Sequence, residues 1–155
     1  MTPAVEAANR ARIAFTTHTY NHDDSAASYG LEAAEKLGVA PECIFKTLVV
    51  SLDGKRLAVG IVPVESQLGL KPIARAAGAK KAALAATAEV ERATGYVLGG
   101  VSPLGQKKRL PTYIDASAEA LETLYVSAGK RGLEIALAPA DLAALARAEF
   151  APLAV

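Results

Sequence analysis

The sequence predicts an α+β fold, in which a single domain over residues 1–155 carries a mixed, mostly antiparallel β-sheet with flanking helices. A length of 155 residues fits one compact domain. Hydrophobic residues make up 52% of the chain and charged residues 21%, which is enough apolar surface for a packed core. Strand and helix patterns mix without a regular βαβ rhythm, and a hairpin signal joins two strands. Both observations favour this fold over a doubly wound one.

The first quarter of the chain is predicted to form a helix, a strand and a second helix. Threonine followed by proline at the start is typical of a helix N-terminus, here for a helix over 3–11. The segment 13–20 is rich in Thr, Phe and Tyr and is predicted to be a strand. Ser25 or Ser28 begins the next helix, and Gly38 ends it because glycine readily takes the left-handed conformation that follows a helix.

The hairpin lies in the middle of the chain. Residues 44–51 form a β-branched, mostly apolar run, Asp53-Gly54 is a two-residue turn signal, and residues 56–62 form the return strand. The remaining patterns predict short elements: helices over 70–77 and 87–93, strands over 96–98, 112–115, 124–127 and 133–137, and a closing helix over 139–146.

Composition argues against several classes of protein. No stretch reaches the roughly 18 uninterrupted apolar residues of a membrane helix, and the N-terminus lacks the pattern of a signal peptide, so we expect a cytoplasmic protein without a membrane partner. Cys43 is the single cysteine, so no internal disulfide or cysteine-based zinc site is expected. Its neighbours Ile44 and Phe45 favour a small core residue over a nucleophile.

Charge is unevenly distributed along the chain. The formal net charge is +1 and tryptophan is absent, which argues against strong independent nucleic-acid binding and against DNA as a partner. Residues 1–45 hold three Lys or Arg against six Asp or Glu, whereas residues 71–131 hold ten against five. The later region is therefore suited to contact phosphate groups.

Lys46 is the first candidate functional residue. It lies within an otherwise apolar strand, and lysine is almost never fully buried unless it is paired. One interpretation is a lysine at a strand end whose ammonium group reaches water. The other is an ammonium group held in a pocket to polarise a carbonyl group. The residues alone leave both open.

A glycine-rich loop over 94–105 is the second candidate. It holds four glycines and a proline, so its backbone can approach a ligand closely. Its spacing matches neither a dinucleotide fingerprint nor a P-loop. The cations Lys107, Lys108 and Arg109 follow directly, and Lys130 and Arg131 follow another glycine. Such cations are either a solvated surface or a contact for polynucleotide phosphates.

Histidines and nucleophiles give no further site. His18 and His22 are four residues apart on a strand and turn, where they do not share one face as they would on a helix. No metal site is therefore expected. No histidine is placed to activate Cys43, and no nucleophile elbow is present, so a catalytic triad has no support.

Several blocks closely resemble the YbaK/EbsC family of editing proteins. They are residues 1–5, 18–20, 45–48, 95–96, 99–112 and 129–133, and the longest reads Gly-Gly-Val-Ser-Pro-Leu-Gly-Gln-Lys-Lys-Arg-Leu-Pro-Thr. The resemblance spans essentially the whole chain. The family belongs to the superfamily of the editing domain inserted in bacterial prolyl-tRNA synthetases, and YbaK-type members clear cysteine from proline tRNA.

The resemblance implies a site and a mechanism. The substrate's own cysteine thiol attacks its ester carbonyl and leaves as a thiolactone, with no cofactor and no metal. Lys46 is the implied catalytic residue. Substrate-binding positions carry over as Tyr20, Tyr29, Thr47, Gly99, Gly100, Ser127 and Glu134. Tyr29 stands where phenylalanine is common, and Glu134 stands where aspartate is common. Lys107, Lys108, Arg109, Lys130 and Arg131 are expected to contact tRNA.

The expected partners are the acceptor end of a mischarged tRNA and prolyl-tRNA synthetase, and a monomer is the default state. Two alternatives remain. One is an enzyme that removes alanine from proline tRNA with a bound water as nucleophile. The other is a non-catalytic module of this fold that binds a tRNA end or a synthetase.

Overall fold

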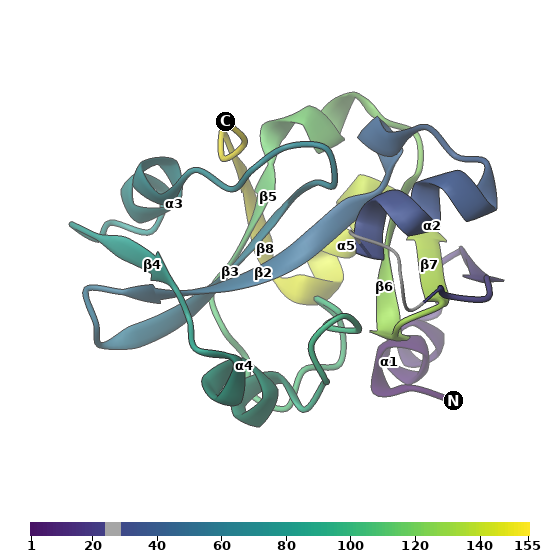
Figure 1. The fold of residues 1–155 in the computed structure, drawn as a ribbon, viewed down its shortest axis with the longest axis horizontal. Helices are drawn as coiled ribbons and strands as arrows, with labels where there is room; N and C mark the ends of the chain where they lie inside the picture. The colour runs from purple at the N-terminus through teal and green to yellow at the C-terminus, as the bar shows by residue number, and fades with distance from the viewer. Residues whose placement is uncertain (24–28) are drawn as a thin grey trace.

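Two β-sheets lie side by side in the computed structural model, which describes residues 1–23 and 29–155 (Figure 1). The small sheet has the order β1–β7–β6, and the large sheet has the order β4–β2–β3–β5–β8. A bridge between Ile44 and Tyr125 joins them. The strands are β1 (Phe15–Thr19), β2 (Phe45–Leu52), β3 (Arg56–Pro63), β4 (Ala82–Leu84), β5 (Thr112–Asp115), β6 (Leu124–Lys130), β7 (Leu133–Leu137) and β8 (Ala148–Ala151).

Strand directions confirm the predicted α+β fold. The pairs within the small sheet are antiparallel, as are β2–β3 and β2–β4. Among the paired strands of the described residues, β3–β5 and β5–β8 are parallel. The sheet arrangement is therefore mixed and mostly antiparallel, as predicted. The sequence did not predict that the strands divide into two sheets.

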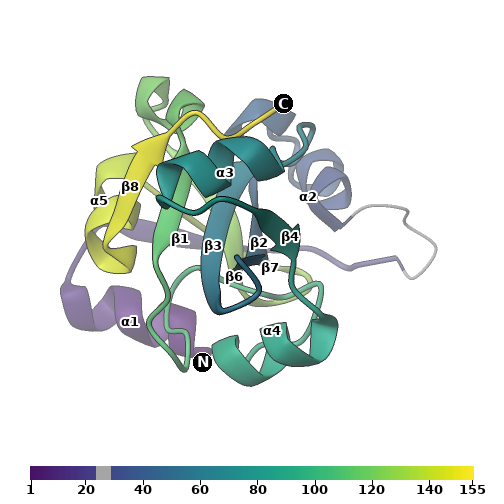
Figure 2. The same ribbon diagram turned by 90° about the vertical axis from the view of Figure 1, so that its left-hand side faces the viewer.

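Helices surround the sheets on several sides (Figure 2). Helix α1 contacts β6 and α5, and α3 lies next to β4. None of the helices in residues 1–23 and 29–155 is long and apolar enough to cross a membrane. The α-helices are α1 (Pro3–Ala11), α2 (Tyr29–Leu37), α3 (Leu70–Ala76), α4 (Thr87–Thr94) and α5 (Pro139–Ala146), and two short 3₁₀ turns cover Pro41–Cys43 and Ala116–Ala120.

The large sheet is buried on both faces, which fixes the direction of each side chain of β2. Val50 packs with Ile73 of α3 on one face. Val49 packs on the other face, in the core that includes α1 and the small sheet. Side chains alternate along a strand, so Lys46 leaves β2 on the face of Val50, and Thr47 leaves it on the face of Val49.

Most of the predicted elements are confirmed, and the strand expected over 96–98 is wrong. That segment is an irregular loop after α4, because the buried Tyr96 hydroxyl donates a hydrogen bond to the Leu104 carbonyl and closes the loop on itself. The short strands β4 and β8 were not predicted. Gly38 ends α2 with φ of 67°, as expected, whereas Ser25 and Ser28 lie outside the described residues.

Candidate functional site

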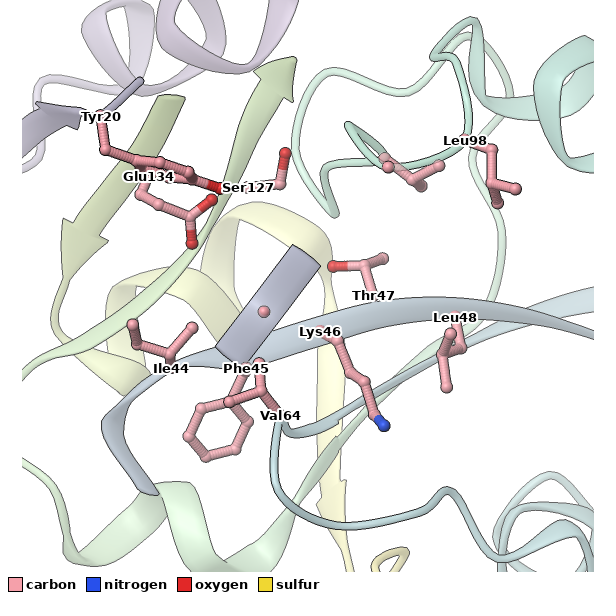
Figure 3. Close-up of a pocket in the computed structure, with 13 residues that line it drawn as sticks. Tyr20, Ile44, Phe45, Lys46, Thr47, Leu48, Val64, Leu98, Ser127 and Glu134 are labelled. Atoms are coloured by element: carbon pink, nitrogen blue, oxygen red, sulfur yellow. The ribbon is translucent and has the colours of Figure 1, made fainter. Parts of the chain in front are cut away.

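A pocket of about 350 Å³ opens beside β2, at the end of the strand that β4 does not cover (Figure 3). Its volume lies at the lower end of the range for small-molecule sites. The walls are mostly apolar. The residues expected from sequence that line it are Tyr20, Lys46, Thr47, Gly99, Ser127 and Glu134.

The outer edge of β2 is open at the pocket. Ala85 N donates to Val49 O at 3.0 Å on this edge, whereas Val64 N donates to Ile44 O at 2.9 Å on the β3 side. Backbone groups alternate between the two edges in an antiparallel strand, so the N–H and C=O of Thr47 point to the outer edge. Strand β4 pairs only with Val50–Leu52 and does not reach this position. The backbone amide of Thr47 therefore faces the pocket side of β2.

The Thr47 side chain adds a second polar group. Its Oγ1 is buried and has no hydrogen-bond partner within the described residues. Burying a hydroxyl group without a partner costs free energy. A ligand atom in the pocket would provide that partner.

Glu134 is an acidic residue of the pocket with a strongly raised pKa. It lies on β7 opposite Ser127 of β6, and the residue is only 6% exposed. Burial raises the pKa of the Glu134 carboxyl to about 8. Burial and, next, the nearby Glu134 raise the pKa of the Tyr20 hydroxyl. Tyr20, Ser127 and Glu134 gather on one side of the pocket in Figure 3. The Glu134 carboxyl is thus mostly protonated at neutral pH, and a bound cation would favour its charged form.

Ser127 does not form a nucleophile and base pair with Glu134. Its Oγ accepts a hydrogen bond from Gly129 N at 3.2 Å. No hydrogen bond joins the Ser127 hydroxyl to the Glu134 carboxyl in the described part of the chain. An activated serine requires such a bond to its base.

Lys46 leaves β2 on the face opposite to Thr47. The residue is half-buried, and burial lowers the pKa of its ammonium group. In Figure 3 the Lys46 nitrogen points away from Glu134 and Ser127. Lys46 thus lines the pocket, and its ammonium group lies apart from the acidic side of it.

The glycine-rich loop forms another wall. Gly99 lines the pocket, whereas Gly100 lines a neighbouring groove together with Lys130 and Arg131. A Cβ atom at Gly100 would lie 2.6 Å from Lys130 Cα, so this glycine allows the loop to pack against the β6–β7 turn. Leu98 lines both hollows and separates them.

The expected tRNA-binding cations divide into two groups. Lys107, Lys108, Arg109 and Lys130 are exposed. Arg131 instead forms an ion pair with the buried Glu32 of α2 at 3.3 Å. Arg131 therefore has a structural partner within the protein.

Several walls of the pocket were not predicted from sequence. The side chain of Tyr29 lies outside the described residues, but the next residue, Gly30, lines the pocket. A Cβ atom at Gly30 would lie 2.2 Å from Val64 Cγ1, so α2 can approach the end of β3 only with glycine here. A glycine near the start of a helix was the only available signal.

The histidines and the cysteine lie apart from the pocket. Nε2 of His18 is 2.8 Å from the Thr16 hydroxyl, and its ring lies 5.1 Å from that of Tyr125. Cys43 is partly exposed in the turn before β2. Within residues 1–23 and 29–155, no three His, Cys, Asp or Glu side chains are grouped to hold a metal ion.

Residues 24–145 match the family model of the aminoacyl-tRNA editing domain. The chain belongs to this family of editing domains, which confirms the resemblance seen in the sequence. It is 42% identical over 118 residues to a protein of Enterococcus faecalis named "Putative Cys-tRNA(Pro)/Cys-tRNA(Cys) deacylase EbsC", an alignment that covers 76% of this chain and 72% of that protein.

Two further relatives support the family assignment and the fold. A proline–tRNA ligase of Shouchella clausii is 34% identical over 101 residues, which are 65% of this chain and 18% of the ligase. A crystal structure described as a "putative trans-editing enzyme for prolyl tRNA synthetase" superposes with a TM-score of 0.86 at 23% identity, covering 99% of this chain and 95% of the other. At that identity the superposition shows the fold alone.

Proposed function

We propose that this protein removes cysteine from mischarged proline tRNA, acting in trans on the aminoacylated end. The observation that carries the proposal is a small, mostly apolar pocket with one buried carboxyl group and no activated protein nucleophile among its described residues. A substrate that brings its own nucleophile fits such a pocket. The cysteine deacylase name of the Enterococcus relative supports the same substrate.

Glu134 is suited to bind the α-ammonium group of the substrate. Its carboxyl is buried, and an arriving ammonium group would favour the carboxylate form. A buried charge pair with hydrogen bonds also fixes orientation. The aminoacyl group would then lie between Glu134 and the open edge of β2.

Residues of β2, across the pocket from Glu134, would stabilise the reacting carbonyl group. The Thr47 N–H points to the open edge of β2, and the neighbouring Lys46 ammonium group would turn toward this edge to act as a second donor. Both are donors for an oxygen that gains negative charge in the transition state. Positioning and charge stabilisation are sufficient for an ester that is already activated.

The reaction then needs no protein nucleophile. The substrate sulfur attacks the ester carbonyl carbon, a C–S bond forms, and the C–O bond to the ribose breaks. The ribose oxygen takes the proton that the thiol gives up, and a thiolactone leaves. A thiol of pKa about 8.5 supplies some thiolate at neutral pH. A serine hydroxyl is a far poorer nucleophile and alanine has none, whereas pocket fit alone separates such small groups by only about 1–3 kcal/mol.

A panel of charged tRNAs tests the proposal. Cysteinyl-tRNA should be cleaved much faster than seryl-tRNA or alanyl-tRNA. Equal rates on alanyl-tRNA would instead indicate a water-based deacylase. Binding of a tRNA end or a synthetase without cleavage of any substrate would indicate a non-catalytic module.

We further propose that prolyl-tRNA synthetase supplies tRNA selection. Cysteine on cysteine tRNA presents the same terminal chemistry, and a small domain at the aminoacyl end reads little else. Docking on the synthetase would raise the local concentration of the mischarged end. Competition between cysteine-charged proline tRNA and cysteine-charged cysteine tRNA, with and without synthetase, tests this idea. A strong preference for proline tRNA that synthetase does not change would contradict it.

A further inference from the structure

A second group of cations lies at the far end of β2 from the pocket. Lys55, Lys80 and Lys81 surround a hollow at the β2–β3 turn, together with Asp53 and Gly54. The three lysines are exposed, and none forms an ion pair within the described residues. We call these three residues the tip lysines. The proposed deacylation reaction does not use them.

Asp53 holds two of these lysines in place. Its carboxylate accepts hydrogen bonds from the backbone N–H groups of Lys80 and Lys81, at 3.1 Å and 2.9 Å. The Asp53 N–H donates in turn to the Lys81 carbonyl at 2.9 Å. Asp53 therefore connects the loop before β4 to the hairpin turn through hydrogen bonds. The three lysine ammonium groups remain available to bind an anion.

Strands β2 and β4 lead from the tip lysines toward the pocket. At about 3.3 Å per residue, the span from Lys46 to Asp53 along β2 is about 23 Å. Strand β4 runs back alongside β2 from the lysines toward the pocket, and the Ala85 N–H that follows β4 bonds to the Val49 carbonyl (Figure 1). Leu84, on this route, is 64% exposed.

We propose that the tip lysines bind phosphates of the RNA strand that leads to the aminoacylated end. This inference rests on the proposed function, because that function places the end of the strand in the pocket. Successive phosphates of one duplex strand advance by about 3.4 Å along the helix axis, so about 23 Å corresponds to about seven nucleotides from the ester. A lysine is a point charge that suits phosphate contacts without base specificity.

Binding of an uncharged RNA hairpin with a single-stranded 3′ end tests the proposal. Its dissociation constant is measured by fluorescence anisotropy across a salt series for the wild type and for Lys55→Ala/Lys80→Ala/Lys81→Ala. We expect about tenfold weaker binding at low salt, and a log–log salt slope shallower by about two. A trinucleotide that corresponds to the 3′ end alone should bind both proteins equally, because it is too short to reach the tip.

Matched variants separate this contact from general loss of charge. Arg10→Ala/Arg12→Asn/Arg147→Asn removes three exposed cations elsewhere, and asparagine tolerates the positive φ at positions 12 and 147. This control should bind the hairpin like the wild type, and so should Lys55→Arg/Lys80→Arg/Lys81→Arg, which keeps the three charges. Unchanged binding by the alanine variant, or an equal loss in the control, would overturn the proposal. Binding is measured without deacylation, so failure of the proposed reaction would be seen separately, in the charged-tRNA panel.

Discussion

Glu32 and Arg131 form an ion pair at 3.3 Å that ties helix α2 to the β6–β7 turn. The Glu32 side chain is buried, and it also accepts a hydrogen bond from Asp23 N and pairs with Lys36. Burial raises the pKa of Glu32, but the hydrogen bonds from Asp23, Lys36 and Arg131 outweigh it and lower the pKa overall. The contact joins two walls of the pocket, because α2 contributes Gly30 and the turn supports the glycine-rich loop.

The neighbours Lys130 and Arg131 should therefore behave differently when replaced. Arg131→Ala leaves a buried carboxylate with fewer partners, so we expect a loss of about 2 kcal/mol in the free energy of unfolding. Lys130→Ala should leave stability unchanged and reduce the salt dependence of tRNA binding. Denaturant unfolding and binding isotherms of both variants measure these effects. Equal stability of the two variants would contradict the structural role of Arg131.

Lys46→Ala should nearly abolish deacylation while the fold survives. The half-buried residue Lys46 lines the pocket, and no other Lys or Arg does so among the described residues. Lys46→Arg should also deacylate its substrate slowly. The planar guanidinium group does not replace the compact ammonium group as a hydrogen-bond donor. Single-turnover rates and circular dichroism of each variant are the measurements. Cys43→Ala, outside the pocket, is the control that should keep most activity, and near-normal turnover of Lys46→Ala would exclude this role.

Glu134→Gln should stabilise the protein above about pH 5 and impair substrate binding. The folded-state pKa of about 8 lies above the ordinary value of 4.5, so the unfolded chain loses this proton first as the pH rises. The contribution of the Glu134 carboxyl to wild-type stability is therefore fully present below pH 4.5 and is lost as the pH rises to about 8. Glutamine does not titrate, so the variant does not lose stability in this way as the pH rises. We expect its melting temperature to exceed that of the wild type at pH 8, with the two values converging near pH 4. A variant less stable at pH 8 would argue against a buried, unpaired carboxyl group.

Thr47 allows its backbone and side chain to be tested separately. Thr47→Pro removes the N–H that points to the open edge, a position where an edge strand tolerates proline. Loss of one such donor should reduce kcat about 100-fold or more. Thr47→Val removes only the hydroxyl group and should have the smaller effect. Melting temperatures verify that both fold, and a folded Thr47→Pro variant with wild-type kcat would exclude the amide as a donor.

Local signals predicted much of the fold. The Asp53-Gly54 turn, the Thr2 cap and Gly38 were readable because each residue fits a specific backbone conformation. Strand β4 was not, because its alanines favour no strand and it forms only by pairing with β2. The loop after Tyr96 closes through a hydrogen bond to a carbonyl eight residues away, which no local pattern specifies.

The site shows the same division. The family resemblance indicated Lys46, Thr47 and Glu134, and all three line one pocket. It did not reveal that Arg131 pairs with a buried acid. The wall formed by Gly30 depends on how closely α2 approaches β3. Such features follow from tertiary packing and are absent from a single sequence.

The proposed reaction depends on attack by the substrate's own thiol. Deacylation of cysteinyl-tRNA should be compared with that of the same tRNA carrying S-methylcysteine, which keeps the ester and the α-amino group but blocks the sulfur. We expect rapid cleavage of the first substrate with release of a thiolactone, and essentially no cleavage of the second. Comparable rates for both substrates would contradict the proposed reaction and would require a nucleophile from the protein or from water.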